Sequence, residues 1–212
     1  MSNSHQVGML SFAKDLPNIS SLLGLLSAMV GIYFAIKGNF PASIICVLWT
    51  VLFDWYDGII ARKMKGRTKE QGVFGVQLDS MIDMVSFGVF PAVLLLSYGN
   101  YNVWFMPGAF IIVAAIAIRL SYFSLYGLID NKTYRGLSVD SNGLILAFLF
   151  LFESFFSHSF FSIILYTSLM VLSALNLSSI AIPKLGGKWV YALIAYVFVM
   201  TSVFGWILWS RV

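Results

Sequence analysis

Apolar runs long enough to cross a membrane recur along this 212-residue chain, and only short polar stretches separate them. Hydrophobic residues make up 59% of the sequence and charged residues 10%, whereas roughly 25% of the residues in an ordinary soluble domain are charged. A membrane-spanning helix needs about 20 apolar residues. The chain therefore has room for about seven such helices joined by short loops. We predict one integral membrane domain over residues 1–212 and no soluble domain.

The apolar runs, with Gly, Pro and polar residues between them, predict an all-α, polytopic membrane helix bundle. Residues 7–16 mix Met9, Leu10 and Phe12 with Lys14 and Asp15, which indicates a short helix on the membrane surface or, alternatively, a disordered lead. Residues 143–180 contain only a modestly polar break, so they form either two spans or one bent helix. With two spans there, the expected helices cover residues 18–36, 41–64, 74–97, 104–125, 143–155, 160–180 and 189–209.

Basic residues gather in three of the loops between these helices. Short loops rich in Lys and Arg face the cytoplasm. We therefore expect the cytoplasmic loops to be those that carry Arg62, Lys63, Lys65, Arg67 and Lys69, then Lys132 and Arg135, and finally Lys184 and Lys188.

Four aspartates, Asp54, Asp57, Asp79 and Asp83, lie in or at the edge of two neighbouring apolar runs. Ionisable groups inside a membrane are costly and usually functional. Helical spacing places Asp54 and Asp57 on one face of their helix and Asp79 and Asp83 on one face of the next. The short loop between the two helices makes them antiparallel neighbours, so all four carboxylates should meet at the cytoplasmic ends. Four acids this close cannot all ionise without a compensating cation.

A divalent metal is the simplest compensation. Carboxylate oxygens suit Mg²⁺, Mn²⁺ or Ca²⁺, whereas zinc prefers His and Cys ligands. The only histidines, His5 and His158, lie far from this cluster in the sequence. A metal held beside Arg62 and a basic loop is an environment that binds phosphate. A cation transporter with acids along its pathway is the alternative class of function. A transport path needs polar groups through the whole membrane, however, and the last three predicted spans carry almost none.

Two segments carry a family resemblance. The runs D-W-Y-D-G-I-I-A-R (54–62) and G-V-Q-L-D-S-M-I-D (75–83) fill every fixed position of the pattern D-x-x-D-G-x-x-A-R…G-x-x-x-D-x-x-x-D. This pattern resembles the signature of the CDP-alcohol phosphatidyltransferases. The continuation L-D-S-M-I-D-M-V-S-F-G-V-F-P-A is similar to the phosphatidylserine synthase branch in particular. Ser138 departs from that branch, which often has Pro at the corresponding place.

The resemblance implies a six-helix core, so the last predicted span would be an extra C-terminal helix. It also implies transfer of a phosphatidyl group from CDP-diacylglycerol to an acceptor hydroxyl, with release of CMP, at the cytoplasmic face of the cell inner membrane. A homodimer is a further implication. By the family pattern, Asp54, Asp57 and Asp79 would hold two divalent ions, Mg²⁺ or Mn²⁺. Asp83 would lie beside the metal and act as general base. The CDP site would be lined by Gly58, Ala61, Arg62 and Gly75.

L-serine is the expected acceptor, while choline, inositol phosphate and glycerol phosphate remain open, as does the lipid chain preference. Arg119 lies near the inner end of the fourth predicted span. It either faces the active cavity and binds the acceptor carboxylate or extends to the interface. Arg135 and Lys132 are further candidates for the carboxylate-binding role.

Overall fold

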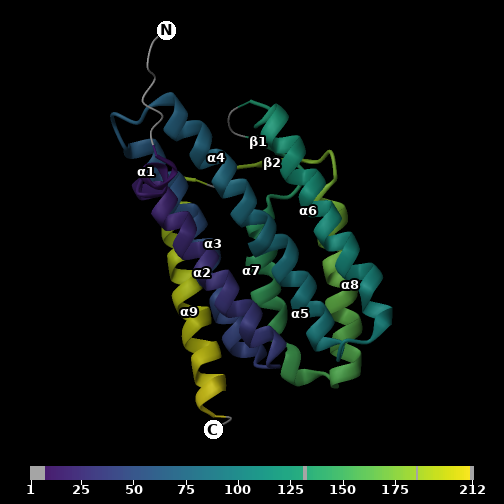
Figure 1. The fold of residues 1–212 in the computed structure, drawn as a ribbon. Coiled ribbons are helices and arrows are strands. Elements are labelled where there is room, and N and C mark those ends of the chain that lie inside the picture. The colour runs from purple at the N-terminus through teal and green to yellow at the C-terminus, as the bar shows by residue number, and fades with distance from the viewer. Residues whose placement is uncertain (1–7, 131–132, 185, 211–212) are drawn as a thin grey trace.

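The computed structural model describes residues 8–130, 133–184 and 186–210, and within them the chain is a helix bundle with one short two-stranded sheet (Figure 1). Lys132 lies outside the described residues. The helices are α1 (Met9–Ala13), α2 (Leu16–Ile36), α3 (Phe40–Lys63), α4 (Lys69–Asp83), α5 (Phe90–Tyr98), α6 (Met106–Tyr126), α7 (Val139–Phe150), α8 (His158–Asn176) and α9 (Trp189–Trp209). Short 3₁₀ helices cover Val103–Phe105 and Glu153–Phe155. The strands are β1 (Thr133–Arg135) and β2 (Ala181–Pro183).

The described residues contain six segments that are long and apolar enough to cross a membrane. These segments are α2, α3, the continuous stretch from α4 to α5, the stretch Val103–Tyr126, α8 and α9. Helix α7 has 12 residues, fewer than a full crossing needs. A turn separates α7 from α8, so residues 143–180 contain two helices rather than one bent helix. The short predicted interfacial helix corresponds to α1.

A π-helical segment, Met84–Val89, joins α4 to α5 directly after Asp83. Pro91 follows in the first turn of α5. Proline has no backbone N–H and therefore cannot donate the hydrogen bond that a regular helix would require there. Wider turns of this kind are frequent at functional sites. Here the wider turn directly follows Asp83, the last of the four aspartates, in the chain.

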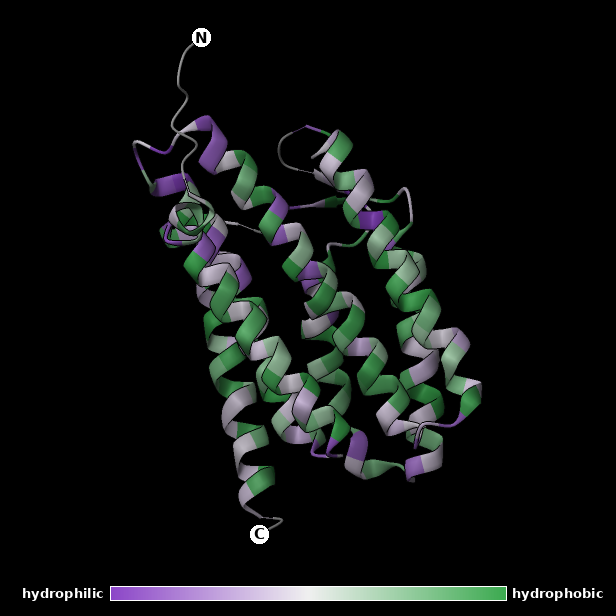
Figure 2. Ribbon diagram, viewed as in Figure 1, coloured by the Kyte–Doolittle hydropathy of each residue, from purple (hydrophilic) through white to green (hydrophobic). Residues whose placement is uncertain are grey.

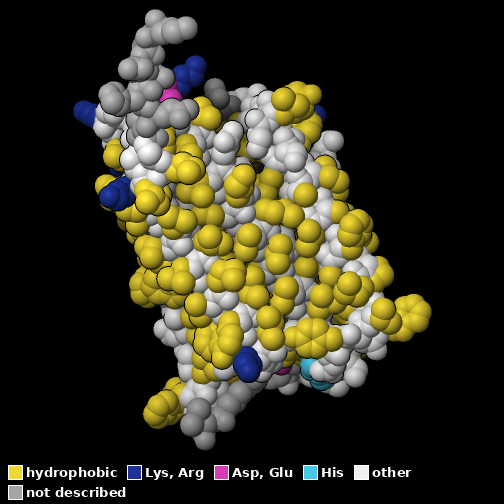
Figure 3. Space-filling view, viewed as in Figure 1, with side chains coloured by type: hydrophobic (Ala, Val, Ile, Leu, Met, Phe, Trp, Pro, Cys, Tyr) yellow, Lys and Arg dark blue, Asp and Glu magenta, His cyan; other side chains and the backbone are white. Residues whose placement is uncertain are grey.

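Hydrophobic side chains cover the middle of the bundle, and polar residues gather towards its two ends (Figures 2 and 3). The exposed apolar residues include Phe110, Ile118, Ile163, Val199 and Trp206, which lie on three different helices. An apolar belt between two polar ends is the surface that a lipid bilayer requires. We conclude that the chain is an integral membrane protein.

Helix α2 packs along α3, and α3 in turn contacts α7 and α9. Small residues permit this close approach. A Cβ atom on Gly31 of α2 would lie 2.9 Å from Cys46 Cβ on α3, and one on Gly143 of α7 would lie 2.7 Å from Val51 on α3. Serine hydroxyls also bond across the interfaces, since Ser27 donates to the Cys46 carbonyl (2.9 Å) and Ser43 to the Gly31 carbonyl (2.9 Å). Small residues and polar side chains are the usual means of helix association in membranes.

One end of the bundle carries α1, the start of α4 and the sheet, and we call it the basic end (Figure 1). The sheet joins two loops that are distant in sequence: β1 follows α6 and β2 follows α8. The strands are antiparallel, with Tyr134 opposite Ile182. The all-α fold predicted from the sequence did not include this sheet. Its pairing brings the loop after α6 and the loop before α9 together at the basic end (Figure 1).

Candidate active site

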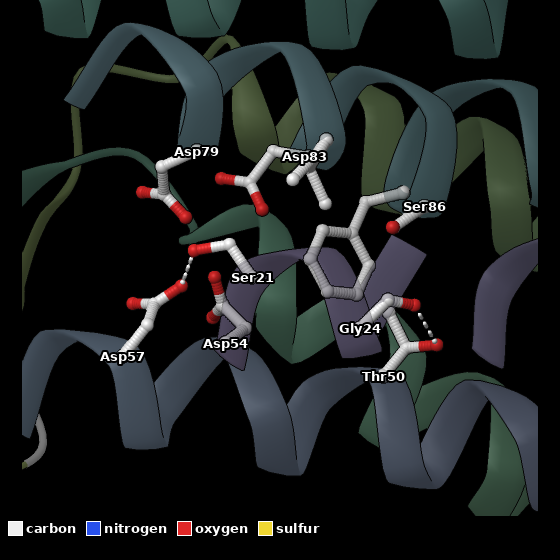
Figure 4. A pocket seen from close by; sticks show the side chains of 10 residues that line it. Ser21, Gly24, Thr50, Asp54, Asp57, Asp79, Asp83 and Ser86 are labelled. Atoms are coloured by element: carbon white, nitrogen blue, oxygen red, sulfur yellow. Dashed lines mark hydrogen bonds between the residues drawn. The ribbon is translucent and has the colours of Figure 1, made fainter. Parts of the chain in front are cut away.

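The four aspartates converge at the basic end, between α3 and α4 (Figure 4). Single carboxylate oxygens of Asp54, Asp57 and Asp79 all lie within 4.8 Å of one another. Asp83, one helical turn beyond Asp79, is buried and lies outside this group of three, although it lines the same cavity. The side chains of all four residues point into the space between the two helices. The predicted convergence of two helices is therefore correct.

Helix α2 supplies a contact that sequence reasoning missed. The Ser21 hydroxyl donates a hydrogen bond to Asp57 Oδ2 at 2.5 Å, and both residues are buried. The neighbouring Ser20 hydroxyl instead donates to the Phe53 carbonyl at 2.9 Å. Ser21 thus holds one carboxylate oxygen of Asp57 in place. In the sequence, a pair of serines in an otherwise apolar span is a signal for this contact.

Gly75 lies at the contact between α4 and α2. A Cβ atom there would come within 3.0 Å of both Arg67 Nη2 and Asn18 Oδ1. Arg67 in turn bonds to Asp15 at the start of α2. The phenyl rings of Phe12 and Phe74 stack nearby, with centroids 5.1 Å apart. The position of Gly75 therefore indicates a packing role, because it lets α4 approach the N-terminal segment.

A cavity of about 760 Å³ opens beside the aspartates. All four aspartates line it, as do Gly58, Arg62 and Arg119. A Cβ atom on Gly58 would lie 3.3 Å from Arg62 Nη1, so the absence of a side chain leaves room for the guanidinium. Ala61 and Gly75 do not line the cavity. Of the four predicted nucleotide-binding residues, Gly58 and Arg62 therefore line the cavity, whereas Ala61 and Gly75 do not.

Arg119 is placed in the cavity wall, which supports the first of the two alternatives for this residue. It is only 6% exposed, and its Nε donates to the Leu137 carbonyl at 3.3 Å. Its guanidinium carbon lies 5.6 Å from the Phe123 ring centroid and 5.8 Å from that of Tyr134. Within the described part of the chain no carboxylate pairs with it. Among the described residues, no hydrogen bond or ion pair engages the terminal nitrogens of this buried cation, so they could bind an anionic ligand.

Arg135 is placed differently from the prediction. It is exposed, donates from Nη1 to the Tyr122 hydroxyl at 2.9 Å and lies outside the cavity wall. Strand pairing explains this difference, because successive residues of a strand point to opposite faces. Tyr134 faces the cavity, so its neighbour Arg135 faces away. The position of Arg135 does not support an acceptor-binding role.

The sheet adds two cavity residues that sequence reasoning missed, Tyr134 and Lys184. The Lys184 ammonium lies 5.6 Å from the centroid of the Tyr134 ring. Burial raises the pKa of the Tyr134 phenol, so its hydroxyl stays protonated at neutral pH. Partial withdrawal from water and then the nearby Arg62 lower the pKa of the Lys184 ammonium. Only the pairing of β1 with β2 brings these side chains to the aspartates, and no local pattern predicts that pairing.

A fifth carboxylate, Asp140, also lines the cavity. It lies in the first turn of α7 and accepts a hydrogen bond of 2.6 Å from the Trp55 indole nitrogen. The cavity wall therefore carries five carboxylates and the basic residues Arg62, Lys63, Arg119 and Lys184, and among the described residues none of these four cations forms an ion pair.

The model of the CDP-alcohol phosphatidyltransferase family matches residues 14–212, which is nearly the whole chain. The chain belongs to the CDP-alcohol phosphatidyltransferase family. This membership, with an acidic cluster at one end of the bundle, favours phosphatidyl transfer over the transporter alternative.

Several relatives of the family are similar to this chain over about two thirds of its length. An archaetidylserine synthase from Methanothermobacter thermautotrophicus is 36% identical over 64% of this chain and 58% of its own. A CDP-diacylglycerol–serine O-phosphatidyltransferase from Methanocaldococcus jannaschii is 31% identical over 63% of this chain and 60% of its own. An enzyme of the same name from Bacillus subtilis is 25% identical over 63% of this chain and 74% of its own. The chain thus spans about three fifths of the two archaeal relatives.

The residues fit the divalent metal that the family uses. Asp54, Asp57 and Asp79 offer three oxygen donors close enough to surround one ion, and oxygen is the donor that Mg²⁺ and Mn²⁺ prefer. Ser21 holds Asp57 in place, as hydrogen-bond partners behind metal ligands usually do. The cluster could therefore hold a divalent metal.

Proposed function

We propose that this protein transfers the phosphatidyl group of CDP-diacylglycerol to the hydroxyl group of L-serine and releases CMP. The observation that carries the proposal is the placement of a buried arginine, Arg119, in the same cavity as the aspartate cluster, with no ion pair to it among the described residues. A buried guanidinium prefers a planar, bidentate anion such as a carboxylate. Family membership accounts for the transfer chemistry, and Arg119 suits an acceptor that carries a carboxylate.

The donor diphosphate would bind over the aspartates. Asp54, Asp57 and Asp79 would hold the metal, and we propose two ions, either Mg²⁺ or Mn²⁺. When bound, the metal neutralises negative charge on the diphosphate and so makes its phosphorus open to attack. Arg62 lies at the cavity edge above Gly58 and would donate to the same phosphate oxygens. Phosphoryl transfer depends mainly on positioning and charge neutralisation, and the three aspartates with their metal and Arg62 would supply both.

Asp83 would act as the general base. It lies one turn deeper than Asp79, is buried, and belongs to the wall of the cavity rather than to the group of three carboxylates. The serine oxygen would attack the phosphorus that carries the diacylglycerol group as its proton passes to Asp83. The bond between this phosphorus and the CMP oxygen would then break, and CMP would leave. A base must lie within hydrogen-bond distance of the hydroxyl that it activates.

The names of the relatives favour serine. The Methanothermobacter and Methanocaldococcus relatives are named for different lipids, but both names contain serine. Arg119 fits a carboxylate, which choline lacks. We propose that the basic end faces the cytoplasm, where CMP and serine are dissolved, and that the lipid tails stay in the membrane. A homodimer remains a prediction from the family resemblance.

An acceptor panel tests the proposal. Purified protein in detergent would receive CDP-diacylglycerol, Mg²⁺ or Mn²⁺, and one acceptor at a time from serine, choline, inositol phosphate and glycerol phosphate. We expect CMP release and a serine-containing phospholipid only with serine and only with metal. CMP release with another acceptor and none with serine would disprove the serine assignment. No CMP release with any acceptor would disprove the proposed activity.

A further inference from the structure

Asp140 lies in the cavity but belongs to neither segment of the family signature. Its Oδ2 atom accepts the 2.6 Å hydrogen bond from the Trp55 indole. That bond fixes the orientation of the carboxylate. Among the described residues, no other hydrogen bond or ion pair reaches Asp140, so its second oxygen is available to a ligand. Trp55 lies between the metal-binding candidates Asp54 and Asp57, which ties the position of Asp140 to the reaction centre.

Opposite charges surround the same part of the cavity. Arg119 and Lys184 both lie against the Tyr134 ring. Burial first and then the negative charge of Asp140 raise the pKa of the Tyr134 phenol, so this carboxylate acts on the same part of the cavity. Even so, neither cation comes within 4.0 Å of Asp140 in the part of the chain that the structure describes. The cavity therefore presents separated positive and negative groups that do not neutralise one another.

A small zwitterion would complete this arrangement. An α-amino acid carries a carboxylate and an ammonium group on the same carbon, and each needs a charged partner once it leaves water. Arg119 suits the carboxylate, and a fixed carboxylate with a free oxygen suits the ammonium. Phosphate-bearing acceptors lack a cation and would be repelled by Asp140.

We propose that Asp140, held by Trp55, binds the ammonium group of the acceptor and makes the enzyme select amino alcohols. The inference rests on the proposed function, because it assigns a further contact to the acceptor of that reaction. It also adds a selection rule: the wall of the cavity rejects hydroxyl compounds without an amino group. Arg119 alone would not distinguish serine from 3-hydroxypropanoate, which is serine without its ammonium.

Three compounds separate the two contacts. Serine carries both charged groups, ethanolamine only the ammonium, and 3-hydroxypropanoate only the carboxylate. Each would be measured as an acceptor and as an inhibitor of serine transfer, so that a compound that is bound but not transferred still yields a constant. The variants are Asp140→Asn, which removes the charge, and Trp55→Phe, which removes the indole N–H that bonds to Asp140 and part of the ring that packs against the core. Thermal unfolding of each variant in detergent shows whether it is folded.

We expect Asp140→Asn to raise the KM for serine and the inhibition constant of ethanolamine by roughly tenfold or more, because a polar group of the ligand loses its partner. The inhibition constant of 3-hydroxypropanoate should stay the same or fall, because the variant lacks the negative charge of Asp140 that repels the carboxylate of this compound. Trp55→Phe should shift the constants in the same direction but less. The metal concentration for half-maximal rate should not change in Asp140→Asn.

Two results would overturn the inference. One is an equal rise in the constants of all three compounds, which would mean that Asp140 only supports the shape of the cavity. The other is a higher metal requirement in Asp140→Asn, which would make Asp140 a metal ligand. If the wild-type protein releases CMP with none of the acceptors, the proposed function fails first and the inference fails with it. If wild-type serine transfer is normal and Asp140→Asn leaves the constants unchanged, only the inference fails.

Discussion

Arg67 donates a hydrogen bond of 2.8 Å from Nε to Oδ2 of Asp15, and this ion pair ties the start of α4 to the start of α2. The Asp15 side chain is 1% exposed and that of Arg67 is 15% exposed. Removing one partner of a buried ion pair leaves an uncompensated charge. The pair also lies beside Gly75, one turn before Asp79 on α4. It therefore helps to set the position of the aspartates on that helix.

We expect Arg67→Gln to destabilise the protein by about 3 kcal/mol or more, because Asp15 would remain buried and unpaired. The double variant Asp15→Asn/Arg67→Gln should recover part of the loss, since no charge is then left without a partner. Thermal unfolding in detergent measures both. Lys65→Gln is the matched control, because Lys65 is exposed in the same loop. A double variant as unstable as Arg67→Gln alone would contradict this account.

Ser21→Ala should weaken metal binding. The substitution removes the hydrogen bond that orients Asp57, and loss of such a partner typically lowers metal affinity by about 10- to 100-fold. Titration of activity with Mn²⁺ measures the shift. Ser20→Ala is the control, because its hydroxyl contacts the Phe53 carbonyl and no carboxylate. An equal shift in both variants would show that the effect comes from packing of α2.

The acid cluster is predictable from helical periodicity, because spacings of three and four residues place side chains on one helix face. Family resemblance then assigns a reaction to it. Tyr134, Lys184 and Asp140 are not predictable in this way. They reach the cavity through contacts between distant segments, namely the pairing of β1 with β2 and the contact of α7 with α3. Single-sequence patterns describe local geometry, so they also failed to show that Arg135 points away.

Asp83→Asn should lower kcat by roughly a hundredfold or more, which is the usual contribution of a general base. The metal requirement should change less than in Asp79→Asn, because Asp79 belongs to the group of three carboxylates and Asp83 does not. Rates measured over a range of Mg²⁺ concentrations separate the two effects. A large shift in the Mg²⁺ requirement with unchanged maximal rate would make Asp83 a metal ligand and not the base.

Arg119→Lys should raise the KM for serine by roughly tenfold or more while the KM for CDP-diacylglycerol stays near its original value. Lysine keeps the charge but cannot form the bidentate contact of a guanidinium. Arg135→Lys provides the control, since Arg135 is exposed and lies outside the cavity. Steady-state kinetics with each substrate varied in turn measure both constants. Equal effects on the two KM values in Arg119→Lys would argue against a contact with the acceptor.

The most direct measurement is the position of Mn²⁺ in crystals grown with Mn²⁺ and a CDP-lipid, found by anomalous scattering. We predict a Mn²⁺ peak among Asp54, Asp57 and Asp79, about 2.1 Å from their carboxylate oxygens and next to the diphosphate. Asp79→Asn crystals should show a much weaker peak. A diphosphate bound elsewhere in the protein, or Mn²⁺ absent from these carboxylates while the nucleotide is bound, would contradict the account.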